Sequence, residues 1–226
     1  MRPKDLKSPF TWNTRHVTVC DRVWYVPEHC PDYEAFSFSG WHSEQFFGNS
    51  NPVIVEYCCG NGHWIEDKAK LHPQRNWLGV EIKFERVRKV WSKIQNNSLP
   101  NLMVACGEAL KTTQLYMPTA SVDEVYVNFP DPWPKTRHTK NRLLQGEFLQ
   151  ELRRILRLDG TITVATDDPG YSNFLIKQFL KAEGFESAYP EPHYINDWPG
   201  YGDSYFDALW RAQGKQIRYH RYLKKG

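Results

Sequence analysis

The stretch Pro52-Val-Ile-Val-Glu-Tyr-Cys-Cys-Gly-Asn-Gly62 indicates the fold class of this chain, because a short apolar run there ends in an acid and a glycine turn. Similar apolar runs recur downstream, at residues 77–80, 102–105, 122–127 and 161–165. Between the runs, apolar side chains repeat with helical spacing in segments such as 87–94 and 148–156. Strands that alternate with helices predict an α/β fold with a mainly parallel sheet and helices on both faces.

The first 50 residues differ in pattern from the rest of the chain. Residues 1–50 show no clean period but contain many aromatic side chains, so we expect a partly ordered extension that packs on the core or over a ligand. Residues 51–226 carry the alternating pattern and are expected to form one domain. Its last strand is predicted at residues 216–223, as an antiparallel strand at the edge of the sheet.

Composition excludes several classes of protein. The formal net charge of +3 is too small to prove nucleic-acid binding. Basic residues nevertheless gather in segments 83–93 and 211–226, and each segment is either a solvated face or a phosphate-binding surface. The five cysteines include no Cys-x-x-Cys pair, so neither a disulfide framework nor a metal site is expected. No apolar run could span a bilayer, and we expect a soluble cytoplasmic protein with no membrane and no obligate protein partner.

Acidic residues follow the first three predicted strands, where ligands of such sheets bind. Glu56 ends the first strand, and Gly60 and Gly62 allow the backbone to approach a ligand, although they could also serve only to shape the turn. Glu81 ends the second strand at a spacing that suits a ribose-binding carboxylate, or else it is an ordinary charge at a helix N-terminus. Glu108, after the third strand, could cap a helix or face a base.

Two cofactor classes fit a ribose-binding acid at this position: a dinucleotide and S-adenosylmethionine. A dinucleotide requires a complete Gly-x-Gly-x-x-Gly turn for its pyrophosphate, but here Cys58 and Ile65 occupy the first and third glycine positions. Glu56 would repel a pyrophosphate and would attract a cationic sulfonium and amino group. The residues therefore favour S-adenosylmethionine.

A second informative stretch is Asn128-Phe-Pro-Asp-Pro-Trp-Pro-Lys-Thr-Arg-His-Thr-Lys-Asn-Arg142. Its prolines predict a stiff loop after the fourth strand, with Asp131 held at the sheet edge as a functional carboxylate or as a simple turn residue. Trp133 is either part of the core or a wall for a flipped base. The cations that follow have phosphates as natural partners. After the fifth strand, Asp167 is expected to point into the same cleft, or to cap the next helix, a role that we favour for Asp168.

These motifs resemble the bacterial tRNA (guanine-N7)-methyltransferases, from about residue 45 to residue 223. The resemblance rests on Asn128–Lys135 with the basic residues after it, on the Glu56 turn, on Gly79-Val-Glu81 and on Ala165-Thr-Asp167. It implies a single Rossmann-like class I methyltransferase domain with a seven-stranded sheet. It also implies methyl transfer from S-adenosyl-L-methionine to N7 of guanine 46 in the variable loop of tRNA.

The resemblance also implies roles for individual residues. Glu56, Gly60, Gly62, Glu81, Glu108 and Asp131 would bind the cofactor, and Asp131 would be the catalytic position. Lys135 and Asp167 would contact the target nucleotide, and Arg137, His138, Thr139, Lys140, Asn141 and Arg142 would engage RNA. A Thr-x-Phe/Tyr-Glu motif of the family corresponds to Ser204-Tyr205-Phe206-Asp207 and would also meet substrate. Cys58 replaces the usual first glycine of the family, and Glu108 stands where aspartate is common.

Two other functions compete with this interpretation. One is a class I methyltransferase acting on an exocyclic nitrogen or a protein side chain, but such enzymes usually carry an Asn/Asp-Pro-Pro-aromatic turn, from which Asn128-Phe-Pro-Asp131 departs. The other is a catalytically inactive RNA-binding protein, an idea supported by Cys58. The acids Glu56, Glu81 and Asp131 argue against it, since a pure RNA binder gains nothing from carboxylates beside phosphates.

Overall fold

The computed structural model describes residues 1–202 and 204–226. It contains two compact units, Met1–Met117 and Pro118–Gly226. Among the described residues, no helix is long and apolar enough to cross a membrane. The division expected at residue 50 stays a prediction, and residues 1–50 contribute two strands to the sheet of the first unit.

The first unit is a mainly parallel sheet. Its strands are β1 (Thr18–Cys20), β2 (Val23–Val26), β3 (Val53–Tyr57), β4 (Asn76–Glu81) and β5 (Leu102–Gly107). They lie in the order β1-β2-β5-β4-β3, parallel throughout except that β1 pairs antiparallel with β2. Every residue of β3 is buried, as expected for a parallel strand with helices on both faces.

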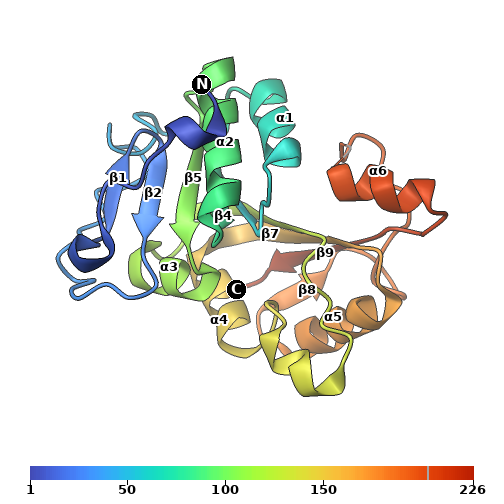
Figure 1. The fold of residues 1–226 in the computed structure, drawn as a ribbon. Coiled ribbons are helices and arrows are strands. Elements are labelled where there is room, and N and C mark those ends of the chain that lie inside the picture. Colours follow the sequence, from blue (N-terminus) through green and yellow to red (C-terminus); the bar gives the residue numbers. More distant parts are fainter. Residues whose placement is uncertain (203) are drawn as a thin grey trace. The chain divides into compact units, whose positions relative to one another are not determined.

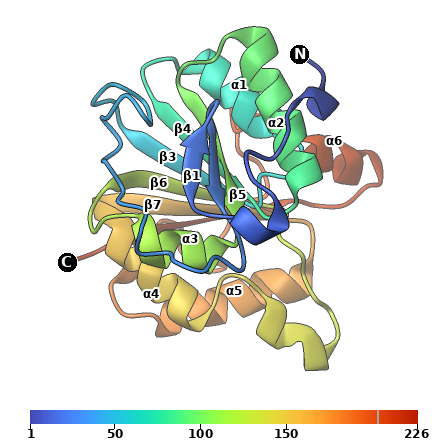
Figure 2. The ribbon, with the colours of Figure 1, turned by 60° about the vertical axis from the view of Figure 1, so that its left-hand side comes forward.

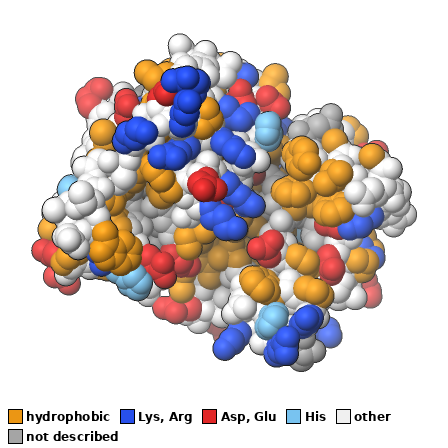
Figure 3. All heavy atoms as spheres, in the orientation of Figure 1, with side chains coloured by type: hydrophobic (Ala, Val, Ile, Leu, Met, Phe, Trp, Pro, Cys, Tyr) orange, Lys and Arg blue, Asp and Glu red, His pale blue; other side chains and the backbone are white. Residues whose placement is uncertain are grey.

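Three α-helices cover these strands: α1 (His63–Leu71), α2 (Phe84–Asn97) and α3 (Ala109–Tyr116). Helices α1 and α2 lie side by side on one face, and α3 lies on the other (Figures 1 and 2). The inner face of α2 buries Val87, Val90 and Ile94, each of which stabilises the fold by roughly 1.5–3 kcal/mol. Its outer face is basic, and Lys and Arg side chains gather over it in Figure 3. The predicted helical spacing of this segment is confirmed.

The N-terminal segment packs on the core of the first unit. Trp24 of β2 is completely buried, with Phe38, Trp41 and Phe46 around it at ring-centroid distances of 5.1–6.2 Å. Two 3-10 helices, η1 (Pro3–Asp5) and η2 (Trp12–Thr14), precede the strands. The start of the chain is attached to α2, because Ser92 Oγ donates a hydrogen bond of 2.6 Å to the Met1 carbonyl. Of the two alternatives for residues 1–50, packing on the core is the one seen in the structure.

The second unit combines parallel and antiparallel pairs. Its strands are β6 (Val122–Asn128), β7 (Leu156–Thr166), β8 (Phe185–Ser187) and β9 (Arg218–Lys224), in the order β6-β7-β9-β8. Strand β6 is parallel to β7, whereas β9 is antiparallel to both β7 and β8. Its helices are η3 (Thr136–Asn141), α4 (Gly146–Ile155), α5 (Pro169–Lys181) and α6 (Tyr205–Ala212). Helices α4 and α5 lie on the same face of these strands (Figures 1 and 2).

The α/β class is confirmed, but two details of the sheet differ from expectation. The described residues form nine strands rather than seven, since the N-terminal segment adds β1 and β2. Strand β9 is antiparallel as predicted, yet it is an inner strand of the second unit, because the three-residue strand β8 pairs along its outer side. A strand as short as Phe185–Ser187 has too few residues to show alternation, so the sequence did not reveal it.

Candidate active site

The turn after β3 is built around backbone conformations that favour glycine. Gly60 and Gly62 have φ of 58° and 70°, and Gly62 is the N-cap of α1. A Cβ atom on Gly62 would lie 2.7 Å from a methyl carbon of Val90, so only glycine allows α1 to approach α2 this closely. Cys58 also has a left-handed φ, of 57°, a conformation that glycine adopts at lower cost than cysteine.

Glu81 is held in one orientation at the end of β4. It is 5% exposed, and its two oxygens accept hydrogen bonds from the backbone N–H groups of Gly60, at 3.1 Å, and Lys83, at 2.8 Å. Arg86 Nη1 lies 3.6 Å from the oxygen that binds Gly60. A carboxylate has about four acceptor positions, so capacity for two ribose hydroxyls remains. Glu81 therefore satisfies one backbone amide of the turn after β3 and one at the N-cap of α2, and these two contacts fix the orientation of its carboxylate.

Glu56 and Glu81 create a negative environment at the ends of β3 and β4. Glu56 is 2% exposed, and its register partner on β4 is Gly79, two residues before Glu81. The pKa of the Cys59 thiol is raised well above its ordinary value, by burial first and then by Glu56 and Glu81. The pKa of Cys106 on β5 is raised to about 12 by burial and by Glu81. Burial, the larger cause, disfavours any charged group, whereas the smaller contribution from Glu56 and Glu81 is the part that would attract a cation such as a sulfonium.

Glu108 caps α3. Its two carboxylate oxygens accept the N–H groups of Leu110, at 3.0 Å, and Lys111, at 2.6 Å. The capping role that the sequence allowed is therefore present. Because Glu81 is paired in register with Cys106, Glu108 lies just beyond the neighbouring strand end. The structure thus brings Glu56, Glu81 and Glu108 to the carboxyl ends of three adjacent parallel strands.

The loop after β6 holds Asp131 between two strained aromatic residues. Phe129 and Trp133 have φ of 51° and 41°, a conformation that costs a residue other than glycine on the order of 1 kcal/mol or more. The Phe129 N–H donates to the Ala165 carbonyl at 2.8 Å, and Asn128 Oδ1 accepts a hydrogen bond from buried Tyr201. Asp131 itself is exposed. The loop is therefore anchored at its base and presents a free-standing carboxylate.

Arg142 braces the same loop from inside. Its Nε and Nη2 donate hydrogen bonds to the carbonyls of Pro132, at 2.9 Å, and Trp133, at 3.3 Å. Its guanidinium also lies over the rings of Tyr171 and Phe174 on α5, 5.6 and 4.5 Å from their centroids. These contacts use N–H groups of Arg142 that would otherwise be available to donate to RNA phosphates. The structure therefore gives Arg142 a structural role, while its predicted contact with RNA stays a prediction.

The other basic residues of this segment are more open. Lys135, Arg137 and Lys140 are exposed along η3, as is Asn141, while His138 and Thr139 are half-buried. Gln145 organises the turn by donating hydrogen bonds of 2.8–3.1 Å to the carbonyls of Thr139, Lys140 and Arg142. The exposed side chains are thus displayed on an ordered segment, which suits contacts with phosphates.

Asp168 has the capping role that the sequence suggested, while the predicted contact of Asp167 with the target nucleotide stays a prediction. Asp168 is the N-cap of α5, because its Oδ1 accepts the Tyr171 N–H at 2.6 Å. Asp167 instead points to Lys215, whose Nζ lies 2.6 Å from its Oδ2 and 3.5 Å from the ring centroid of Trp210. Since Asn128 pairs in register with Ala165, Asp167 and the Asp131 loop follow neighbouring parallel strands. The second unit therefore brings these two acids to the same edge.

The segment Ser204–Asp207 begins α6 and divides into buried and exposed members. Ser204 is the N-cap and accepts the Asp207 N–H at 3.0 Å. Asp207 is 3% exposed and accepts hydrogen bonds from Arg211, at 2.6 Å, and from the Tyr219 hydroxyl. The pKa of Tyr219 is raised to about 12, by burial first and then by Asp207. Tyr205 and Phe206 are 60% and 41% exposed, so these two are the open members of the segment, and its predicted contact with substrate stays a prediction.

Several residues of the site were not found by sequence reasoning. They are Arg86 beside Glu81, Tyr201 on Asn128, Gln145 under η3 and Lys215 on Asp167. Tyr201 and Lys215 act through contacts with distant segments, whereas Arg86 and Gln145 contact residues of their own neighbourhood. Arg86 and Lys215 belong to the basic segments 83–93 and 211–226, but the sequence did not indicate which acid each would pair with.

Comparison with known proteins identifies the family. A family model described as "Putative methyltransferase" matches residues 50–218. A tRNA (guanine-N(7)-)-methyltransferase of Chlamydia felis is 43% identical over 225 residues, covering 100% of this chain and 98% of that protein. The chain belongs to the tRNA (guanine-N(7)-)-methyltransferase family. The enzyme of that name from Brevibacillus brevis, a more distant relative in this methyltransferase family, is 37% identical and covers 69% of the chain and 71% of that protein.

Solved structures support the methyltransferase fold. The 16S rRNA methyltransferase KamB aligns with a TM-score of 0.60 at 17% identity, covering 84% of this chain and 96% of that one. A SAM-dependent methyltransferase from Aquifex aeolicus aligns with a TM-score of 0.54 at 16% identity, covering 76% and 82% of the two chains. At these identities the likeness concerns the fold alone. It confirms the Rossmann-like class I architecture that the resemblance implied.

Proposed function

We propose that this protein transfers the methyl group of S-adenosyl-L-methionine to N7 of a guanine in tRNA, and that the target is guanine 46 of the variable loop. The observation that carries this proposal is the row of acids at the ends of β3, β4 and β5 in a chain of this family. The buried carboxylates of Glu56 and Glu81, at the ends of neighbouring strands, would attract a sulfonium ligand there. A cytoplasmic location would follow from a tRNA substrate.

The chain's own residues would act mainly by positioning. The cofactor supplies an electrophilic methyl group; the S–CH₃ bond breaks as the N–CH₃ bond forms, and the positive charge passes from sulfur to the purine. Guanine N7 carries a lone pair and no proton, so no strong general base is needed. Glu81 would accept hydrogen bonds from ribose hydroxyls, and Glu56 would attract the positive end of the cofactor.

Asp131 is proposed as the catalytic residue. Its exposed carboxylate on a braced loop could orient the exocyclic amine of guanine or stabilise the cationic ring that forms on methylation. Asp167 and Lys135 would hold the target nucleotide, with Tyr205 and Phe206 as exposed aromatic contacts. For Asp167 to do so, its ion pair with Lys215 must open or be shared with the substrate. Arg137 and Lys140 would bind the RNA backbone.

The decisive experiment is labelled-methyl transfer to bulk tRNA, followed by nucleoside analysis. We expect 7-methylguanosine as the product, and no product on tRNA whose guanine 46 is replaced by adenine. Asp131→Ala should lose at least about a hundredfold in turnover while the protein stays folded, as for the loss of one preorganised group. Near-normal turnover of that variant would refute the catalytic role of Asp131.

The same assay separates the competing functions. Methylation on an exocyclic nitrogen would yield a different nucleoside, and a protein methyltransferase would leave tRNA unlabelled. An inactive RNA-binding protein would show no S-adenosylmethionine binding by calorimetry. For the proposed enzyme, Glu81→Gln should weaken cofactor binding, because an amide accepts fewer hydrogen bonds from ribose hydroxyls than a carboxylate does.

A further inference from the structure

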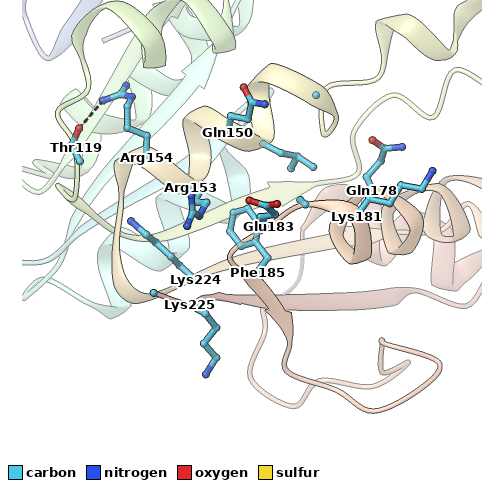
Figure 4. Close-up of a pocket in the computed structure, with 14 residues that line it drawn as sticks. Thr119, Gln150, Arg153, Arg154, Gln178, Lys181, Glu183, Phe185, Lys224 and Lys225 are labelled. Carbon is cyan, nitrogen blue, oxygen red and sulfur yellow. Dashed lines mark hydrogen bonds between the residues drawn. The ribbon is translucent and has the colours of Figure 1, made fainter.

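A basic groove lies on the second unit, away from the Asp131 loop. It has a volume of about 850 Å³ and is formed by α4, the C-terminal end of α5, the start of β8 and the end of β9. Figure 4 shows the labelled side chains that these elements contribute. The charged residues of its lining are Arg153, Arg154, Lys181, Glu183, Lys224 and Lys225.

The positive charge of this basic groove is only partly balanced. Arg154 is paired with Glu151 at 2.6 Å, and Lys225 is paired with Glu186 at 3.2 Å. Among the ion pairs of residues 1–202 and 204–226, none involves Arg153, Lys181 or Lys224. The negative groups of the lining are the side chain of Glu183 and the main-chain carboxylate of Gly226. The lining therefore has an excess of cations that an anionic partner would neutralise.

Two of these cations are held near each other by the fold. A Cβ atom on Gly184 would lie 2.1 Å from Arg153 Nε, so the guanidinium rests directly on the backbone of that glycine. Lys224 Nζ donates a hydrogen bond of 2.6 Å to the Leu156 carbonyl. The pKa of Lys224 is lowered by burial and then by the charge of Arg153. An anion between the two side chains would offset this repulsion, so the groove is electrostatically prepared for a negative ligand.

The character of the basic groove favours a phosphate backbone over a base or a small enclosed anion. Arg153, Lys181 and Lys225 are exposed and spread along the rim, so they do not converge on one enclosed point. The aromatic residue of the lining, Phe185, packs edge-on against Phe179, with ring centroids 5.4 Å apart. Phe185 is also half-buried, so the lining offers a nucleobase only part of one ring to stack on. Exposed cations without a stacking surface are typical of contacts that read charge and not sequence.

The groove is remote from the residues proposed to bind the target nucleotide. Lys224 follows Leu223, which pairs with Thr161 near the start of the parallel part of β7, whereas Asp167 comes after the end of β7. Six residues of extended strand separate the two positions, which corresponds to roughly 20 Å at about 3.3 Å per residue. A ligand in the groove would thus not compete with the target nucleotide, but a large polyanion could reach both.

We propose that this groove is a second docking surface for the phosphodiester backbone of the tRNA substrate, outside the region that contains the target guanine. The inference rests on the proposed function, because it takes tRNA as the polyanion. It assigns Arg153, Lys181 and Lys224 to affinity for full-length tRNA and gives them no part in the methyl transfer itself.

The test compares two double variants of equal charge. Arg153→Ala with Lys181→Ala removes two groove cations, and Lys4→Ala with Lys177→Ala removes two exposed cations that do not line the groove. Binding of tRNA is measured across a salt series, together with kcat and KM on full-length tRNA and on a short stem-loop that carries the target guanine. Thermal melting establishes that both variants are folded.

For the groove variant we expect tRNA affinity lower by on the order of tenfold at low salt and a salt slope reduced by about 1 to 2. The loss should appear in KM for full-length tRNA, with kcat and the stem-loop kinetics unchanged. If the groove variant binds tRNA like the control pair, the proposal is wrong, even when the wild-type protein makes 7-methylguanosine. Loss of inorganic pyrophosphate binding with unchanged tRNA affinity would show a small-anion site instead. Absence of methyl transfer by the wild-type protein would refute the proposed function separately.

Discussion

Replacing Arg142 by alanine separates a loop-bracing role from an RNA-binding role. The change removes hydrogen bonds to the Pro132 and Trp133 carbonyls and the contacts with the rings of Tyr171 and Phe174. A hydrogen bond from a charged donor contributes roughly 1.5–3 kcal/mol, and an exposed cation–π contact about 0.5–1 kcal/mol. Because Arg142 is half-buried, water reduces these values, and we expect a loss of about 2 kcal/mol in the free energy of unfolding.

Loss of the Arg142 contacts should also lower catalytic activity, because they hold the loop that carries Asp131. Without it the strained Trp133 can relax, and Asp131 loses its fixed place, so kcat/KM should fall roughly ten- to a hundredfold. Urea denaturation and steady-state methyl transfer measure the two effects. The salt slope of tRNA binding should not change. Arg142→Lys should rescue little, since a lysine cannot bind two carbonyls in a planar fork.

Arg137→Ala is the matched control for this prediction. Arg137 is exposed, and its side chain contacts the neighbouring His138 at 3.2 Å. This variant should keep its unfolding midpoint while its salt slope falls by about 1. The bracing role would be refuted if Arg142→Ala kept wild-type stability and instead lowered the salt slope as Arg137→Ala does.

Two further predictions concern strain and pH. Cys58→Gly should raise the free energy of unfolding by roughly 0.5–1 kcal/mol, because the strain relieved at the left-handed φ exceeds the cost of the greater chain entropy of glycine. Calorimetry should show no loss of cofactor binding. A lower urea midpoint for this variant would contradict the prediction. His220 is buried against Ser172, the His193 carbonyl and Tyr222, and burial lowers its pKa from 6.5 to about 4. The contribution of neutral His220 to the free energy of unfolding is therefore complete above pH 6.5, and roughly 3 kcal/mol of it is lost as the pH falls towards 4. In urea denaturation, the free energy of unfolding of His220→Gln should depend less on pH over this range than that of the wild type. Parallel pH curves for the two proteins would refute the assignment.

Local patterns were enough to predict most of the elements. Strands β3 to β7 and helices α2 and α4 were recognised because apolar spacing along the chain reports which face is buried. Asp168 was correctly favoured as a helix cap, since capping depends on residues within one turn. Glu81 and Glu108 were placed at strand ends for the same reason, and both of their local roles are seen.

Contacts between distant segments could not be predicted in this way. Asp207 resembled a substrate-binding acid in its motif, yet in the structure it is buried against Tyr219 and Arg211. Arg142 was grouped with exposed cations because it follows them in sequence, although its guanidinium turns inward to the loop. Some partners are close in sequence, such as Arg211 for Asp207, but the rings of Tyr171 and Phe174 beside Arg142 and the Tyr219 hydroxyl on Asp207 come from other segments, which the local sequence does not indicate.

The sequence by itself determined the fold class, the family resemblance and the acids that follow the strands, because hydrophobic periodicity and short motifs are properties of neighbouring residues. Tertiary structure alone decided which of the basic and acidic side chains are available to a ligand. Exposed Arg137 and buried Asp207 differ in this respect through packing and not through residue type. A side chain is buried or paired only after folding has brought separate segments together, and the local charge balance follows from that pairing. The groove around Arg153 and Lys224 is an example.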